Sequence, residues 1–236
     1  MTELLYQQDA YIKAFDAVVT NVSEDAVVLD STAFFPSGGG QPSDHGTLSS
    51  GGHTWPVVKV RKVGDEVWHH VEVGLPTVGS QVKGEIDWER RYQLMRTHTA
   101  MHILCGVIWR DYSASVTGGQ MQPLRGRMDF EFETMRKELV HEIEKKINVE
   151  VQAARVVKIH FLPREEAFEI PDLIRTKINL LPPAIQVVRV VEIEGLDLQA
   201  DGGTHVASTE EVGEIRIVDY KSKGAINKRL VVELDE

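Results

Sequence analysis

The sequence predicts an α+β protein in which a small antiparallel β-barrel precedes a mixed domain built around one histidine-bearing helix. Two patterns support this fold class. Residues 1–88 hold short Val- and Ile-rich runs separated by turn residues, whereas residues 89–236 mix helical with strand-like periodicity. The longest helical pattern covers residues 87–111, at the junction. We therefore expect a β-barrel-like domain over 1–88 and an α+β domain over 89–236.

The strand-like runs of the first domain occupy residues 26–29, 56–63, 67–73 and 81–86. They are rich in β-branched residues, and clusters of Gly and Ser separate them. A closed barrel is the expected arrangement because closure leaves no exposed strand edge. Helix is expected in this domain at most within the first dozen residues.

The second domain alternates helical and extended patterns. Met128, Phe130 and Phe132 alternate with polar residues as in a half-buried strand, and apolar residues at spacings of four predict an amphipathic helix over 133–149. The other expected elements are a turn at 117–120, a strand over 151–161, short helices over 163–171 and 172–180, a strand over 185–193, and a hairpin of strands 213–218 and 229–234.

The charge of the chain argues against one class of function. With 26 Lys and Arg against 36 Asp and Glu, the formal net charge is −10, which disfavours nucleic-acid binding through a general basic field. The charge is uneven, however, since residues 1–90 hold 6 basic against 13 acidic residues and residues 91–236 hold 20 against 23. A local basic cluster is either a phosphate contact or a solvated turn, and it consists of Lys221, Lys223, Lys228 and Arg229.

Three features indicate a cytoplasmic protein that does not enter a membrane. The single cysteine, Cys105, excludes an intramolecular disulfide and fits a reducing compartment. The first residues are acidic where a secretory signal would be basic and then apolar. No uncharged apolar run approaches membrane-spanning length.

The helical segment 87–111 carries the strongest chemical signal. Asp87 is a predicted N-cap, and His98 and His102 lie four residues apart, so both imidazoles project from one helix face and can reach one ion. Such a pair is half of a metal site, and the motif Asp-Gly-Gly-Thr-His, with Asp201 and His205 at its ends, is the candidate for the other half. The alternative is two ordinary histidines on a half-buried helix.

A glycine-rich loop interrupts the first domain. Gly38, Gly39 and Gly40 lie between two prolines, so the middle of the loop has no side chains and lets another backbone or a ligand approach closely. The loop lacks the Lys-Ser/Thr of a phosphate-binding P-loop, which excludes nucleotide binding of that type. It is either a tight turn between strands or a contact with the second domain or its substrate.

Four stretches of the chain together resemble a known family. They are FPSGGGQPSD at 35–44, the segment from DWERR at 87–91 to HTAMH at 98–102, DLQADGGTHV at 197–206, and SKG at 222–224. In this order they resemble the stand-alone alanyl-tRNA editing proteins, the AlaX group, which are similar to the editing domain of alanyl-tRNA synthetase. The glycine-rich loop ahead of the helix is typical of the medium-length members, which carry an N-terminal β-barrel-like domain.

The resemblance implies a cytoplasmic hydrolase that acts on tRNA. The family removes serine, and in some cases glycine, from mischarged tRNA(Ala) by ester hydrolysis at a site holding one Zn²⁺ per chain. An alanine pocket cannot strongly reject an isostere that merely adds a hydroxyl, so a second site must sort the product. The metal either activates the reaction or anchors the amino acid, and these two roles stay open.

The resemblance also assigns the metal ligands to His98, His102, Asp201 and His205. The family usually has cysteine where Asp201 stands, but aspartate is a competent zinc ligand through oxygen. A site without thiolate should hold zinc less selectively against other divalent ions. The alternatives are that water fills the fourth position, or that Cys105, on the same helix, supplies sulfur.

Substrate contacts are assigned on the same basis. Thr97, Thr99 and Gln120 are the candidates for orienting the amino acid, because they donate and accept hydrogen bonds. The candidate contacts to tRNA are Gly38, Gly39, Gly40, Gln41, Lys223, Lys228 and Arg229.

Other functions remain open at this level. One is a zinc hydrolase for another small ester or amide, although no Glu follows His98 as in a metalloprotease. Another is a non-catalytic protein with a structural metal. Editing of a different tRNA is a third, because threonyl-tRNA synthetase has a domain with a similar metal motif.

Overall fold

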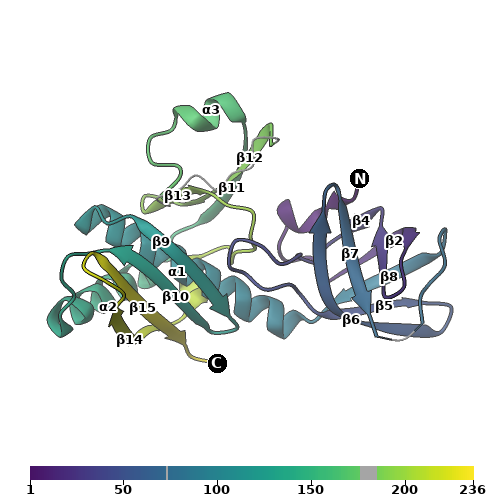
Figure 1. Ribbon diagram of the computed structural model, residues 1–236, viewed down its shortest axis with the longest axis horizontal. Coiled ribbons are helices and arrows are strands. Elements are labelled where there is room, and N and C mark those ends of the chain that lie inside the picture. Colours follow the sequence, from purple (N-terminus) through teal and green to yellow (C-terminus); the bar gives the residue numbers. More distant parts are fainter. Residues whose placement is uncertain (73, 176–184) are drawn as a thin grey trace. The chain divides into compact units, whose positions relative to one another are not determined.

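A computed structural model describes residues 1–72, 74–175 and 185–236 (Figure 1). The chain divides into two compact units, Met1–Gln93 and Leu94–Glu236. The division falls inside the long helix α1 (Trp88–Tyr112), whereas the sequence suggested a division between residues 88 and 89. Within the described residues, no helix combines the length and apolar character needed to cross a membrane.

The first unit is a closed antiparallel barrel, as the sequence predicts. Its valine-rich inner face forms the core, with side chains such as Val27, Val60 and Val67 fully buried. Around the barrel the strand order is β2 (Ala14–Val22), β3 (Ala26–Leu29), β7 (Glu66–Val71), β6 (His53–Val63), β5 (Gly46–Ser50) and β8 (Gln81–Ile86).

The first dozen residues contain little helix. The short strand β1 (Glu3–Leu4) pairs in parallel with β4 (Ser31–Thr32), and a 3₁₀ turn, η1 (Leu5–Gln7), follows β1. The expected terminal helix is therefore reduced to this one turn. Its residue Tyr6 is buried and packs edge-on against Phe35, so tertiary packing holds the segment.

Helix α1 begins where the capping signal predicts. The Asp87 carboxylate accepts a hydrogen bond from the backbone N–H of Arg90 at 3.2 Å, which confirms Asp87 as the N-cap. One turn later, the fully buried Arg91 forms an ion pair with the fully buried Asp44. The Arg91 guanidinium also donates to the Ala10 carbonyl at 2.9 Å, so this one side chain attaches the start of α1 to the barrel unit.

In the second unit α1 packs on a four-stranded antiparallel sheet. The sheet has the order β14 (Ile215–Ser222), β15 (Asn227–Leu234), β10 (Arg125–Glu131) and β9 (Val116–Gln122) (Figure 1). The predicted C-terminal hairpin is confirmed by the pairing of β14 with β15. Met101 of α1 lies against Gly119 and Gly126, where a Cβ would come within 3.3 and 2.9 Å of its side-chain atoms.

The predicted turn at 117–120 is wrong, because these residues belong to strand β9. Glycine in a strand interior often marks a close approach by another element. Here that element is α1, whose Met101 occupies the space that a side chain at Gly119 would need. Gly119 thus permits helix–sheet packing within a continuous strand.

A second, three-stranded antiparallel sheet consists of β11 (Val157–Pro163), β12 (Val187–Ile193) and β13 (Asp197–Ala200). The sequence did not predict β13, since no strand is expected between the strand over 185–193 and the C-terminal hairpin. Instead the chain reverses at Gly195, whose φ is +72°, and β13 pairs with β12. The hairpin of β12 and β13 thus positions the glycine motif, which follows β13, beside the histidines of α1.

The remaining elements differ from expectation mainly at their ends. Helix α2 (Lys137–Gln152) begins four residues later than predicted and continues into the start of the predicted strand. The short acidic helix is confirmed as α3 (Arg164–Glu169), and a further 3₁₀ turn is η2 (Thr209–Val212). Of the helix expected over 172–180, residues 176–180 lie outside the described residues, and the described part at 172–175 is not helical.

Candidate metal centre

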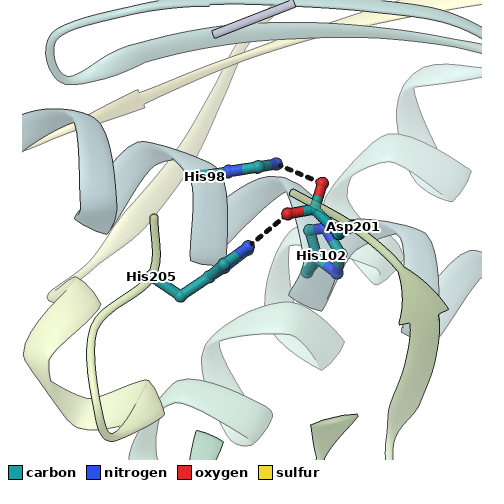
Figure 2. Close-up of side chains that lie close together, drawn as sticks. All are labelled: His98, His102, Asp201 and His205. Carbon is teal, nitrogen blue, oxygen red and sulfur yellow. Dashed lines mark hydrogen bonds and ion pairs between the residues drawn. The ribbon is translucent and has the colours of Figure 1, made fainter. Parts of the chain in front are cut away.

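Two segments about a hundred residues apart bring four side chains together. His98 and His102 project from one face of α1, and Asp201 and His205 come from the loop after β13 (Figure 2). One potential ligand atom from each residue can be chosen so that all four lie within 4.8 Å of one another. The His205 Nε2 lies 3.1 Å from Asp201 Oδ2, and the His98 Nε2 lies 3.5 Å from Asp201 Oδ1.

The loop that carries Asp201 is held by hydrogen bonds rather than by glycine backbone conformations. Neither Gly202 nor Gly203 has a positive φ, and a Cβ on Gly202 would meet no atom within 4 Å. The turn is closed instead by Asp201, whose Oδ2 accepts from the Gly203 N–H at 2.6 Å. Upstream, the Asp201 carbonyl accepts from the Arg189 guanidinium at 2.9 Å.

Two further side chains orient the imidazoles. The Nδ1 of His102 lies 2.9 Å from Asp197 Oδ2, and the Nδ1 of His205 lies 3.2 Å from Thr99 Oγ1. When each Nδ1 carries the proton and donates it in these contacts, the corresponding Nε2 is left with a free lone pair. This arrangement is the usual way in which proteins orient a metal-binding histidine.

Asp197 is itself fixed by two neighbours that sequence reasoning missed. Gln199 donates to Asp197 Oδ2 at 2.7 Å, and the Arg175 guanidinium forms an ion pair with Oδ1 at 2.9 Å. The available signal was the alternation of Asp197 and Gln199, which puts both on one face of a strand just before Asp201. Because the sequence does not predict β13, this alternation alone does not reveal that Asp197 and Gln199 share one face of a strand.

The electrostatics of His98, His205 and Asp201 favour the protonation state that a cation requires. Burial lowers the pKa of His98 to about 4, and burial together with the neighbouring His98 lowers the pKa of His205 well below its usual value. Burial disfavours the Asp201 anion, yet the surrounding histidines, first His98, hold the pKa of this carboxyl well below its ordinary value. For His102, burial is outweighed by the hydrogen bond and charge of Asp197, which raise its pKa. Neutral imidazoles beside a carboxylate are competent ligands.

The donor set fits a divalent ion. Three imidazole nitrogens and one carboxylate oxygen match the ligand types that zinc takes at tetrahedral sites. The predicted alternative, Cys105, is not in this group. It is buried, its Sγ accepts from the Gln199 amide at 3.4 Å, and burial raises the pKa of its thiol. A buried thiol of this kind is an apolar filler rather than a ligand.

The candidates for orienting the amino acid lie in different surroundings. Thr99 is buried, and its oxygen contacts His205 Nδ1 and the Val206 N–H, so it is engaged in orienting the site. Thr97 is also fully buried, on α1. Gln120 is exposed on β9, and its carbonyl oxygen accepts from Arg127 at 2.9 Å.

The glycine-rich loop of the first unit forms a tight two-residue turn. Gly38 and Gln41 exchange backbone hydrogen bonds of 3.0 and 2.9 Å, and Gly39 and Gly40 have φ of +58° and +89°. These positive φ values are the conformation that favours glycine in a hairpin turn. Gln41 is buried, whereas Gly38, Gly39 and Gly40 are exposed.

Of the three candidate basic contacts, two have internal partners. The Lys228 ammonium is buried and donates to the Gly224 and Ala225 carbonyls, and Arg229 forms a two-point ion pair with Asp129. Lys223 is exposed between β14 and β15. Lys223 is therefore the residue of this cluster best able to meet an anion.

Comparison with known proteins identifies the class. The family model described as "tRNA synthetases class II (A)" matches residues 6–90, and the model described as "Threonyl and Alanyl tRNA synthetase second additional domain" matches residues 188–231. The barrel unit and the segment that carries Asp201 and His205 are therefore similar to parts of aminoacyl-tRNA synthetases. The chain is 41% identical to the alanine–tRNA ligase of Pyrococcus furiosus over 92% of its own length and 24% of the ligase.

Full-length relatives define the family. The chain is 40% identical to the alanyl-tRNA editing protein AlaX-M of Saccharolobus solfataricus over 98% of both chains. It is also 40% identical to the AlaX-M protein of Methanosarcina barkeri over 99% of both chains. The chain belongs to the AlaX-M family of alanyl-tRNA editing proteins, which confirms the resemblance found in the sequence.

Proposed function

We propose that the chain is a free-standing deacylase that hydrolyses the ester between a wrong amino acid and tRNA(Ala), chiefly serine and also glycine. The observation that carries this proposal is the convergence of His98, His102, Asp201 and His205 in a chain with full-length AlaX-M relatives. The proposed cofactor is one Zn²⁺ per chain.

The four side chains would hold the ion through the three imidazole Nε2 atoms and the Asp201 carboxylate. When bound, zinc supplies a Lewis acid that functions near neutral pH. Asp201 stands where the family usually has cysteine, so every ligand is nitrogen or oxygen. Such a site is expected to accept Co²⁺ and Mn²⁺ more readily than a site with a thiolate.

The chain's own residues would orient and shield the reaction. Asp197 holds the His102 ring and Thr99 holds the His205 ring, so their Nε2 atoms stay directed at one point. The side chain of Asp201 is 18% exposed, against 8% or less for the three imidazoles, so solvent reaches the site on the carboxylate side. In this proposal the ester approaches from that side.

Recognition of the amino acid rests on hydrogen bonding to the serine hydroxyl. A site built to bond a hydroxyl rejects an analogue without it by about 10⁴–10⁵-fold, which would exclude alanine; glycine also lacks the hydroxyl and is therefore expected to be a far slower substrate than serine. Gln120 remains our candidate for this contact, because its amide is exposed and Thr99 is already engaged with His205. Thr97, which is buried, is expected to act by packing. Lys223, with the glycine-rich turn of the first unit, remains the proposed contact to tRNA.

The test is deacylation of Ser-tRNA(Ala), Gly-tRNA(Ala) and Ala-tRNA(Ala) with bound metal measured in each protein. His102→Ala and Asp201→Ala should lose both metal and activity, and the matched control His141→Ala, an exposed histidine on α2, should keep both. Cys105→Ala should also retain zinc. Hydrolysis of Ser-tRNA(Ala) by metal-free protein at the wild-type rate would refute the zinc proposal, and no hydrolysis by metal-loaded protein would refute the editing proposal.

One observation favours a second candidate, a structural metal. The three imidazoles are nearly completely buried, as ligands of structural ions usually are. A structural ion contributes folding energy directly, so its removal should unfold the second unit. Circular dichroism of His98→Ala separates the two candidates. A folded, inactive protein supports catalysis, and an unfolded protein supports the structural function.

A further inference from the structure

The barrel unit is acidic overall, but its unpaired positive charge is concentrated on one strand. Residues 1–93 contain 7 Lys and Arg against 13 Asp and Glu. Three of these seven basic residues, Lys59, Arg61 and Lys62, lie within four positions of β6, and all three are exposed. No ion pair joins any of them to another described residue.

The other four basic residues of the unit are engaged. Lys13 lies over the Trp88 ring, with its Nζ 4.5 Å from the centroid, and Lys83 forms an ion pair with Glu85 at 2.5 Å. Arg90 donates to the Ser43 carbonyl at 3.3 Å. The fourth, Arg91, forms the buried ion pair with Asp44 described above. The three cations of β6 differ from these four residues, because they have no ion-pair partner among the described residues and, lying beside one another, they repel.

A β-bulge directs two of the three charges outward. Val57 pairs with Val71 of β7, but the next partner, His70, faces Lys59 rather than Val58, so Val58 is an extra residue. The extra residue shifts the alternation by one, which leaves Val60 fully buried and both Lys59 and Arg61 on the outer face. Without the bulge, Lys59 and Arg61 would point toward the barrel interior. Lys62 pairs with Val67 and therefore lies on the opposite face of the strand, where it is exposed near the strand's end.

The facing strand extends this outer surface. Arg61 pairs across the ladder with Trp68 and Lys59 with His70, and both partners are only half-buried because the alternate residues of β7, such as Val67, fill the core. The surface therefore combines cations with an aromatic ring. The Cα atoms of Lys59 and Arg61 are about 6.6 Å apart on an extended strand, a spacing comparable to that of consecutive phosphates along a nucleic acid.

We infer that Lys59 and Arg61 on the outer face of β6, together with the exposed Lys62 near the end of this strand, form a phosphate-binding strip for the sugar–phosphate backbone of the RNA substrate. Charge complementarity identifies the partner, since a cluster of unpaired cations on an otherwise acidic unit attracts a polyanion only at that place. Contacts of this kind position an RNA without reading its sequence. The inference rests on the proposed function for the identity of the RNA, and it adds a contact to the barrel unit that the sequence did not indicate.

The experiment compares wild type with the triple variant Lys59→Gln, Arg61→Gln and Lys62→Gln in binding to uncharged tRNA(Ala) over a range of salt concentrations. Loss of three phosphate contacts should weaken binding at low salt and reduce the slope of log K against log salt by about 2 to 3. The matched control is Lys83→Gln, an exposed lysine of the same barrel that already has an acidic partner, and its slope should equal that of wild type. Thermal melts should be unchanged, because the three side chains are exposed.

The outcomes distinguish this inference from the proposed function. With Ser-tRNA(Ala), the triple variant should show a raised KM and an unchanged kcat, because no residue of the strip belongs to the metal centre. A triple variant with the wild-type salt slope and KM would overturn the strip while leaving the deacylase proposal intact. Equal losses in the triple variant and in Lys83→Gln would also overturn it, since the effect would then follow net charge alone. If the wild type fails to deacylate Ser-tRNA(Ala) but the triple variant still binds tRNA more weakly than the wild type does, the strip is supported and the deacylase proposal is refuted.

Discussion

Asp197→Asn tests whether the geometry around His102 supports metal binding. In the structure the Asp197 carboxylate lies 2.9 Å from His102 Nδ1, and it also accepts from Gln199 and forms an ion pair with Arg175. Asparagine keeps the shape of the side chain but removes its charge. The imidazole then loses a charge-assisted hydrogen bond that makes Nε2 a better donor to a cation.

The expected loss follows from this one contact. Removing a carboxylate behind a metal-binding histidine typically costs about 10–100-fold in metal affinity or activity. That range corresponds to roughly 1.4–2.7 kcal/mol. We expect the Asp197→Asn variant to bind Zn²⁺ more weakly by this factor. Its deacylation activity should stay below that of wild type even when its site is saturated with Zn²⁺.

Competition with a chromophoric chelator measures the zinc dissociation constant directly. The matched control is Asp129→Asn, in which an aspartate paired with Arg229 is changed outside the metal centre. That variant should lose some stability and keep its zinc affinity. An Asp197→Asn variant with wild-type zinc affinity would refute the argument that Asp197 orients His102 for a metal.

Three predictions concern the fold. Asp44→Ala leaves the buried Arg91 without its counter-ion and should lower the free energy of unfolding by about 3–5 kcal/mol, measured in urea; a loss below 1 kcal/mol would mean that the pair contributes little. Burial lowers the pKa of His69 to about 4, so the unfolded chain takes up this proton first as pH falls below 6.5. The contribution of His69 to the free energy of unfolding should therefore be fully present above pH 6.5 and fall by roughly 2 kcal/mol by pH 5. His69→Gln should remove this part of the pH dependence. Parallel pH profiles of stability for wild type and His69→Gln would contradict the assignment. Gly126→Val forces a side chain against Met101 and should cost about 1–3 kcal/mol in thermal unfolding, and an unchanged melting temperature would show that α1 can move away from the sheet.

Local patterns in the sequence determined those features that depend on near neighbours. Short runs rich in Val and Ile between turn residues located strands 26–29 and 81–86 with their observed ends, and the Asp87 capping signal located the start of α1. The spacing of His98 and His102 was sufficient to put both on one helix face, because helical periodicity is set within a few residues. Aspartate and histidine at 201 and 205 were recognisable as partners through a motif rather than through geometry.

Only the tertiary structure decided how the distant parts meet. Glycine at 118 and 119 predicts a turn because this preference is local, yet both residues pair with β10 as part of a strand, and Met101 packs against Gly119. Asp197 became significant only once β13 paired with β12 and brought it to His102, 95 residues away. Such contacts depend on which elements pack together, and packing is a property of the whole core that no short window of sequence contains.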